Sequence, residues 1–177
     1  MRLIAMRLIA ATAVLAWTTV ALTAQKMDRA GIVNYTKVDA VVACGGATDT
    51  NALEALKNDG FKAVINLRQA SEPGANIEAN AARAEALGLV YIHLPLNGQA
   101  PDPKIVDAFL AAVADKANQP VFIHCGSASR VGAVWLVKRV LQDGWPIEKA
   151  TEEAKLIGLR SAPLEQFALK YIAEHKK

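Results

Sequence analysis

Cys125 stands in the segment whose residue types are best suited to chemistry. The apolar run Val121–Ile123 leads into His124 and Cys125, and four small residues, 126–129, separate this cysteine from Arg130. Backbone N–H groups of a small-residue loop converge where the next helix starts, and such a cradle attracts anions. The same field stabilises a thiolate, the nucleophilic form of cysteine. The segment therefore predicts a cysteine nucleophile at the base of an anion-binding loop.

The residues that follow Cys125 are predicted to bind the anion. Gly126, Ser127, Ala128 and Ser129 would supply backbone amides, and the guanidinium of Arg130 can grip two oxygens of a tetrahedral anion. An arginine at a helix start opposes the helix dipole, which indicates that an anion faces it. An inert buried thiol is the alternative for any cysteine, but these neighbours favour a reactive one.

Two residues near this loop are candidates for supporting roles. His124 alternates with Cys125 along the strand, so we expect it on the other face, fixing the loop by hydrogen bonds or serving as a core histidine. Cleavage of a phosphate ester needs a general acid, and Asp102 is the carboxylate of the loop 95–102. A helix cap before Pro103 is the alternative role for Asp102.

Arg68 and Glu72 follow another apolar run, Ala63–Leu67. We expect them to form an ion pair on the rim of the site or to contact substrate, with a solvated loop as the alternative. Cys44 ends an earlier strand, and a disulfide between Cys44 and Cys125 remains an open alternative.

The elements that position these residues alternate along the chain. The sequence predicts strands at 39–43, 63–67, 90–94 and 120–124, and helices at 52–58, 77–87, 130–142 and from 103, 146 and 161 onward. Strands separated by helices form parallel β-α-β units. We therefore expect an α/β fold: a single compact three-layer domain with a mostly parallel sheet flanked by helices. Ligands of such sheets bind beyond the carboxyl ends of the strands, where Cys125 falls.

The N-terminus has the layout of a secretory signal peptide. Arg2 and Arg7 precede the apolar run Leu8–Val20, and small residues lead to a cleavage point after Ala24. We predict a signal peptide at 1–24, a mature domain at 25–177 and export to the periplasm or the medium. An uncleaved membrane anchor is the alternative.

Charge and composition restrict the partners. The net charge falls from +3 to +1 without the two arginines of the signal peptide, and the chain has no basic run. Nucleic acid is therefore not an expected partner, nor is a membrane once the signal peptide is removed. Three scattered histidines and two cysteines without a Cys-x-x-Cys spacing predict no metal site, and we expect no cofactor.

The order strand, His-Cys, loop, Arg, helix resembles the phosphate loop of the protein tyrosine and dual-specificity phosphatases. The segments Gly60–Arg68 and Tyr91–Pro95 fall in matching order, and the likeness is closest to a bacterial phosphatase-like domain also found fused to beta-lactamase-like hydrolases. Members of that branch have been labelled both phosphatases and sulfurtransferases. The resemblance implies a dual-specificity-phosphatase-like fold, with Cys125 as nucleophile, Arg130 as anion clamp and Asp102 as acid by loop position.

Two departures from the phosphatase pattern keep three functions open. The loop from Gly126 to Ser129 is one residue shorter than the usual phosphatase loop and has the rhodanese length, and Val131 replaces the usual hydroxyl residue. The leading interpretation is a phosphatase that forms a phosphocysteine on Cys125. The alternatives are a sulfurtransferase with a persulfide on Cys125, and a non-catalytic domain that binds anions. The expected substrate is a phosphorylated or sulfane-sulfur small molecule or protein.

Overall fold

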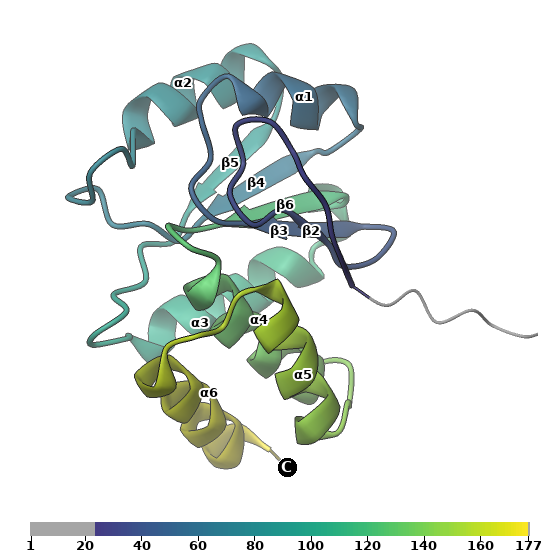
Figure 1. The fold of residues 1–177 in the computed structure, drawn as a ribbon, viewed down its shortest axis with the longest axis vertical. Helices are drawn as coiled ribbons and strands as arrows, with labels where there is room; N and C mark the ends of the chain where they lie inside the picture. The colour runs from purple at the N-terminus through teal and green to yellow at the C-terminus, as the bar shows by residue number, and fades with distance from the viewer. Residues whose placement is uncertain (1–23, 177) are drawn as a thin grey trace, which may run out of the picture.

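The computed structural model describes residues 24–176, which form a mixed six-stranded sheet with helices on both faces (Figure 1). The predicted signal peptide, apart from Ala24, lies outside the described residues. Among the helices of this part of the chain, none is long and apolar enough to cross a membrane.

The sheet is parallel where it carries the site. Its strand order is β1-β2-β3-β6-β4-β5. The parallel strands are β3 (Val42–Gly45), β4 (Ala63–Asn66), β5 (Val90–His93) and β6 (Val121–His124), whereas β1 (Gln25–Lys26) and β2 (Thr36–Lys37) add an antiparallel edge. β6 lies between β3 and β4, so the residue after β6 emerges at the centre of the sheet's carboxyl edge.

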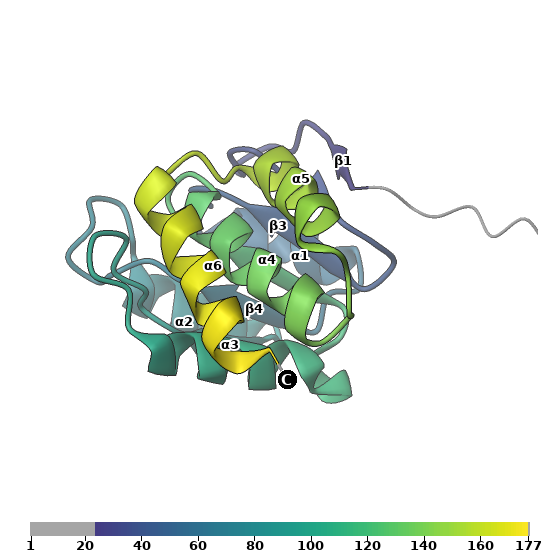
Figure 2. The same ribbon diagram turned by 90° about the horizontal axis from the view of Figure 1, so that it is seen from below.

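The helices form the two outer layers. One face is covered by α1 (Ala52–Asn58) and α2 (Ile77–Ala86), as Figure 1 shows. The other face carries α3 (Pro103–Ala114), a short 3-10 turn (Lys116–Asn118), α4 (Ser129–Leu141), α5 (Ile147–Ile157) and α6 (Ala162–His175) (Figure 2). The predicted three-layer α/β domain with a mostly parallel sheet is confirmed.

The core consists of one apolar cluster on each face of the sheet. Phe122 packs with Leu53 and Leu56 under α1, and Ile123 packs with Trp135 under α4. α4 is buried nearly all round, which fits a central helix that continues directly from the loop after β6. Side chains alternate along β6, so the strand sends successive residues into different clusters.

The predicted strand at 39–43 is wrong in its bounds. The strand β3 is Val42–Gly45, so it begins three residues later than predicted and continues through Cys44 to Gly45. A turn precedes the strand, where the Asp39 carboxylate accepts a hydrogen bond from the backbone N–H of Val41 at 2.9 Å. The strands β1 and β2 were not predicted, because strands of two residues show no periodicity. The other predicted elements agree with the structure to within a few residues at their ends.

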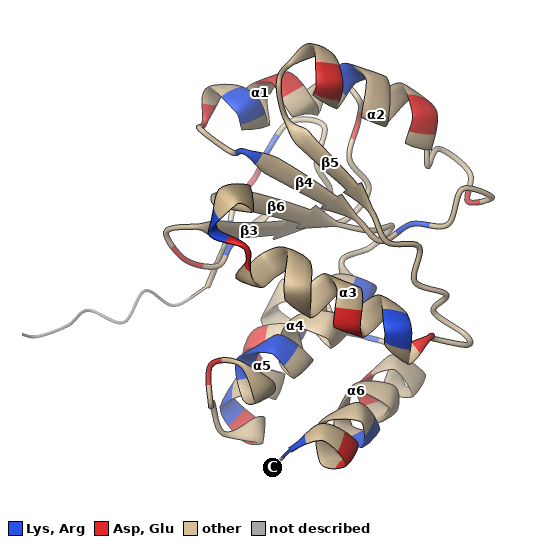
Figure 3. Ribbon diagram, turned by 180° about the vertical axis from the view of Figure 1, so that it is seen from behind, with Lys and Arg blue, Asp and Glu red and all other residues tan. Residues whose placement is uncertain are grey.

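Charged side chains are spread over the outer helices. Figure 3 shows basic and acidic residues interspersed along α1, α2, α5 and α6. Several pair across helices, for example Arg83 with Glu54 at 2.6 Å. This mixed surface fits the near-neutral charge expected of residues 25–177.

Candidate active site

Cys125 follows β6 directly and is buried, with 1% of its surface exposed. Its backbone N–H donates to the carbonyl of Gly45 at 3.3 Å, so the end of β3 holds it in place. Cys44 lies opposite Ile123 in the sheet register, and both cysteines are free thiols. Burial raises the pKa of the Cys44 thiol well above its usual value. Cys44 is therefore a core residue in this structure.

The loop of residues 126–129 is tightly enclosed by its neighbours. A Cβ atom on Gly46 would lie 3.1 Å from the carbonyl oxygen of Gly126, and one on Gly158 would lie 2.8 Å from Cβ of Ala128. Ser129 begins α4, and its hydroxyl accepts a hydrogen bond from the backbone N–H of Arg160 at 3.1 Å. The loop is thus fixed between the end of β3 and the turn that joins α5 to α6.

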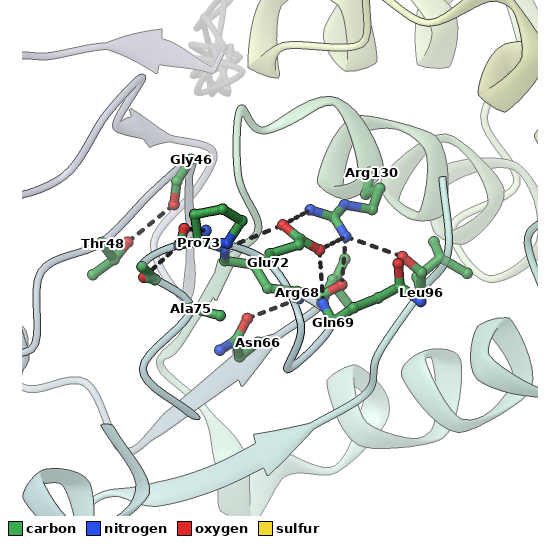
Figure 4. A network of polar contacts seen from close by, with 12 residues as sticks. Gly46, Thr48, Asn66, Arg68, Gln69, Glu72, Pro73, Ala75, Leu96 and Arg130 are labelled. Carbon is green, nitrogen blue, oxygen red and sulfur yellow. Dashed lines mark hydrogen bonds and ion pairs between the residues drawn. The ribbon is translucent and has the colours of Figure 1, made fainter. Parts of the chain in front are cut away.

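Arg130 is held by three parts of the chain (Figure 4). Its Nη1 donates to the carbonyls of Leu67 at 3.2 Å and Leu96 at 3.1 Å, and to Oε1 of Glu72 at 2.5 Å. Its Nη2 donates to Oε2 of Glu72 at 2.8 Å. Burial acts to lower the pKa of Arg130, but the hydrogen bonds to Glu72 and the nearby Cys125 raise it. The guanidinium is therefore a fixed positive charge beside the cysteine.

Glu72 forms the ion pair with Arg68 that the sequence predicted, and it also has a second partner that sequence reasoning missed. It was expected to pair with Arg68 on the rim, but its carboxylate also makes the two-point contact with Arg130. Oε2 of Glu72 lies 3.5 Å from the position that a Cβ of Gly126 would take, so the carboxylate sits at the edge of the loop. Glu72 is thus the carboxylate that pairs with Arg130 among the described residues.

The ion pairs keep Glu72 ionised. Its hydrogen bond from Arg130, and those from the backbone of Gln69 and from Arg68, lower the pKa of Glu72 to about 2 against the opposing effect of burial. A carboxyl group with this pKa holds no proton at neutral pH. Glu72 therefore positions Arg130 and is unsuited to protonate a leaving group.

Arg68 is not on the rim, contrary to the prediction, because only 7% of its surface is exposed. Its guanidinium donates to the carbonyls of Gly74 at 2.8 Å and Pro73 at 2.6 Å and to Glu72 at 3.3 Å (Figure 4). The buried Arg68 side chain thereby holds together the loop that follows β4. This closed loop carries Glu72 to Arg130.

His124 lies on the face of the sheet opposite Cys125, as the alternation predicted. Its ring stacks on Phe122 with centroids 5.7 Å apart, and it is 1% exposed. Burial and then the charge of Arg68 lower the pKa of His124 to about 3, so the ring is neutral. Its Nδ1 has no hydrogen-bond partner among residues 24–176. His124 is thus a buried, neutral ring packed on Phe122, and backbone contacts with Gly46 and Cys125 oppose the lowering of its pKa.

Asp102 caps α3, as its sequence context indicated. Its Oδ1 accepts a hydrogen bond from the backbone N–H of Lys104 at 2.9 Å, and the residue is exposed. The loop that leads to it begins beside the site, where Leu96 accepts from Arg130. The structure brings Cys125, Arg130 and Glu72 together but shows no contact of Asp102 with them.

The fold and the site are those of a cysteine-dependent phosphatase domain. A buried cysteine at the carboxyl end of a central parallel strand, a tight loop and a fixed arginine define that class. The family model described as "DSP-PTPase phosphatase fused to NAD+ Kinase" matches residues 10–167. The chain therefore belongs to this family of dual-specificity-type phosphatase domains.

Solved structures share the fold at low sequence identity. A DUF442 protein of Shewanella putrefaciens, named as a candidate phosphatase, is 21% identical with a TM-score of 0.72, and the match covers 83% of this chain and 96% of that one. The catalytic core of the PP-IP phosphatase SIW14 from S. cerevisiae is 20% identical with a TM-score of 0.66, covering 78% and 85%. TpbA of P. aeruginosa is 19% identical with a TM-score of 0.65, covering 86% and 89%. No curated protein matches the chain in sequence.

Proposed function

We propose that the protein hydrolyses phosphate monoesters through a phosphocysteine on Cys125. The observation that carries this proposal is the pairing of the buried thiol, at the base of its loop, with a guanidinium fixed beside it by Glu72. A fixed cation and converging amides stabilise the equatorial oxygens of a phosphoryl group in its transition state without rearrangement. The membership in a phosphatase family supports the same chemistry.

The reaction has two steps. In the first, the Cys125 thiolate attacks phosphorus, an S–P bond forms, and the bond from phosphorus to the ester oxygen breaks with its electron pair on that oxygen. In the second, water attacks phosphorus, the S–P bond breaks, and phosphate and the thiolate are released. Val131 is buried and has no hydroxyl to offer the departing sulfur. We therefore expect the second step to be slow and the phosphocysteine to accumulate.

The phosphocysteine can be trapped to test this proposal. The purified protein is mixed with p-nitrophenyl phosphate, quenched in acid within milliseconds to seconds, and digested for mass spectrometry. The expected result is a burst of p-nitrophenol and the mass of one phosphoryl group on the peptide that contains Cys125. Turnover with the label on another residue, or no turnover of any phosphomonoester, would overturn the proposal.

Asp102 is proposed as the acid that protonates the leaving oxygen. Its cap bond uses Oδ1, which leaves Oδ2 free of the helix cap. Asparagine caps helices as well as aspartate does, so Asp102→Asn removes the proton and keeps the helix. The expected result is a kcat/KM, which reports the first step, that falls about tenfold more for phenyl phosphate than for p-nitrophenyl phosphate, whose leaving group needs less protonation. Equal changes with both substrates would show that Asp102 is a helix cap alone.

The substrate is proposed to be a phosphorylated small molecule or protein. Two structures of similar fold support this class: a cysteine-to-serine variant of TpbA is described in complex with phosphotyrosine, and SIW14 is named a PP-IP phosphatase. A panel of phosphotyrosine peptides, sugar phosphates and inositol phosphates tests the range. A substrate that contains no phosphoryl group, turned over faster than every member of the panel, would contradict this class.

Sulfur transfer is a second candidate because of the loop length. Four residues separate Cys125 from Arg130, as in rhodaneses, and a persulfide on Cys125 needs no general acid. Incubation with thiosulfate followed by intact-mass measurement tests this candidate. The gain of one sulfur atom on Cys125, lost on addition of a thiol acceptor, would support it, and an unchanged mass would exclude it.

Export is proposed from the composition of residues 1–24. Two arginines, an apolar run and small residues before Ala24 support a cleaved signal peptide. N-terminal sequencing of the protein isolated from cell fractions tests this proposal. A mature chain that begins at Gln25 in the periplasm or medium is the expected result, and an intact N-terminus in the cytoplasm would contradict it.

A further inference from the structure

Asn34 reaches the cysteine loop from a distant part of the chain. Its side-chain Nδ2 donates to the backbone carbonyl of Ser127 at 3.2 Å, across 93 positions of sequence. Its backbone is left-handed, with φ of 53°, a conformation that asparagine tolerates better than most residues. Its carbonyl also accepts from the Thr36 hydroxyl at 3.2 Å, so the turn that carries the side chain is itself fixed.

The contacts on the outside of the loop determine where its N–H groups point. The carbonyl of Gly126 accepts from the backbone N–H of Ala47 at 2.8 Å, and the carbonyl of Ser127 accepts from Asn34. In a trans peptide the C=O and the next residue's N–H point in opposite directions. The N–H groups of Ser127 and Ala128 therefore point away from Asn34 and Ala47, and neither has a backbone hydrogen-bond partner among residues 24–176.

Ala128 needs this support because its backbone is unusual. Its φ is 74°, and a left-handed alanine costs about 1 kcal/mol or more unless its surroundings fix it. The peptide before Ala128 is fixed by Asn34, and the carbonyl of Ala128 accepts from Gly132 at 2.9 Å in the first turn of α4. A loop one residue shorter than usual thus obtains its shape from contacts outside itself.

We propose that Asn34 is a positioning residue of the anion site: its side-chain amide holds the Ser127 carbonyl outward and so aims the Ala128 N–H at the bound phosphoryl group. The inference rests on the proposed phosphatase function and adds a residue from outside the cysteine loop to its machinery. Asn34 does not touch substrate. It acts on the geometry of the loop amides. Its removal should therefore weaken anion binding and lower the rate, because the transition state is stabilised less.

The test is to replace Asn34 by glycine and measure tungstate binding by calorimetry. Glycine adopts the left-handed conformation at no cost, so Asn34→Gly removes the hydrogen bond alone. The expected result is a dissociation constant for tungstate that rises about tenfold, with kcat for p-nitrophenyl phosphate falling by a similar factor. Asn34→Asp, which keeps the size but turns the donor into a charged acceptor facing the Ser127 carbonyl, should lose more.

Asn76→Gly is the matched control. Asn76 is also left-handed, with φ of 46°, and its side chain makes no cap hydrogen bond to α2. The Asn76→Gly variant should bind tungstate with the same affinity as the wild type. If Asn34→Gly and Asn34→Asp also bind tungstate as the wild type does, the proposal is wrong while the phosphatase function stands. A wild-type protein that binds no tungstate would overturn both.

Discussion

Replacing Cys125 by serine is expected to lower kcat for p-nitrophenyl phosphate by at least about 10³-fold. A serine hydroxyl is not ionised at neutral pH and needs an adjacent base to become a nucleophile. His124 cannot be that base, because its ring lies on the other face of the sheet, stacked on Phe122. The carboxylate of Glu72 is committed to two arginines. Cys125→Ser therefore leaves the anion cradle in place without an attacking group.

Steady-state kinetics and tungstate calorimetry separate this effect from damage to the fold. Cys125→Ser should bind tungstate within about threefold of the wild type, since the amides and Arg130 are untouched. Cys44→Ala is the control, because Cys44 is a buried thiol of the same core cluster and takes no part in the proposed mechanism. It should keep its turnover. Residual activity in Cys125→Ser above about one tenth of the wild-type rate would contradict a cysteine nucleophile.

The sequence predicted the part of the site that is contiguous along the chain. Residues 121–130 contain strand, nucleophile, loop and arginine in order, so local patterning was enough to locate them. The apolar run before Cys125 implied a buried parallel strand, and the sheet confirms it as β6. Alternation along that strand also placed His124 on the opposite face. Short-range periodicity determines these features, and they needed no tertiary information.

The residues that support the site came from far away and were missed or misplaced. Glu72 precedes Arg130 by 58 positions, and Asn34 precedes Ser127 by 93. Sequence spacing paired Glu72 with Arg68, four positions away, and that contact exists at 3.3 Å. Nothing in the spacing showed that the carboxylate also reaches Arg130. That contact arises because β4 and β6 are adjacent in the sheet, so that the loops after them meet.

Replacing Glu72 by glutamine is expected to lower kcat for p-nitrophenyl phosphate by about 10²-fold. Two effects compete in this variant. Removal of a negative charge beside the loop favours binding of an anionic substrate, whereas loss of the two-point contact lets the Arg130 guanidinium move. A small displacement of the Arg130 guanidinium weakens its stabilisation of the transition state, and this lowers kcat. We expect this loss to exceed the gain in substrate binding that comes from removing the Glu72 charge. KM should stay level or fall while kcat falls.

Glu72→Gln should also change how stability depends on pH. The folded pKa of Glu72 is about 2, against an ordinary value of 4.5, so its ion pairs contribute to the free energy of unfolding above pH 4.5. That contribution is lost as pH falls from 4.5 towards 2. Because 24% of the Glu72 side chain is exposed, solvent screens its ion pairs, and we expect their contribution to the free energy of unfolding to be about 2 kcal/mol at neutral pH.

Urea unfolding at a series of pH values measures this contribution. The difference in the free energy of unfolding between wild type and Glu72→Gln should be largest near neutral pH and shrink as the solution is acidified. Glu54→Gln is the control, because Glu54 pairs with Arg83 on the surface with 59% of its side chain exposed, and such pairs contribute little. Parallel pH profiles for wild type and Glu72→Gln would show that Glu72 does not hold Arg130 by charge, and the loss of kcat would then need another cause.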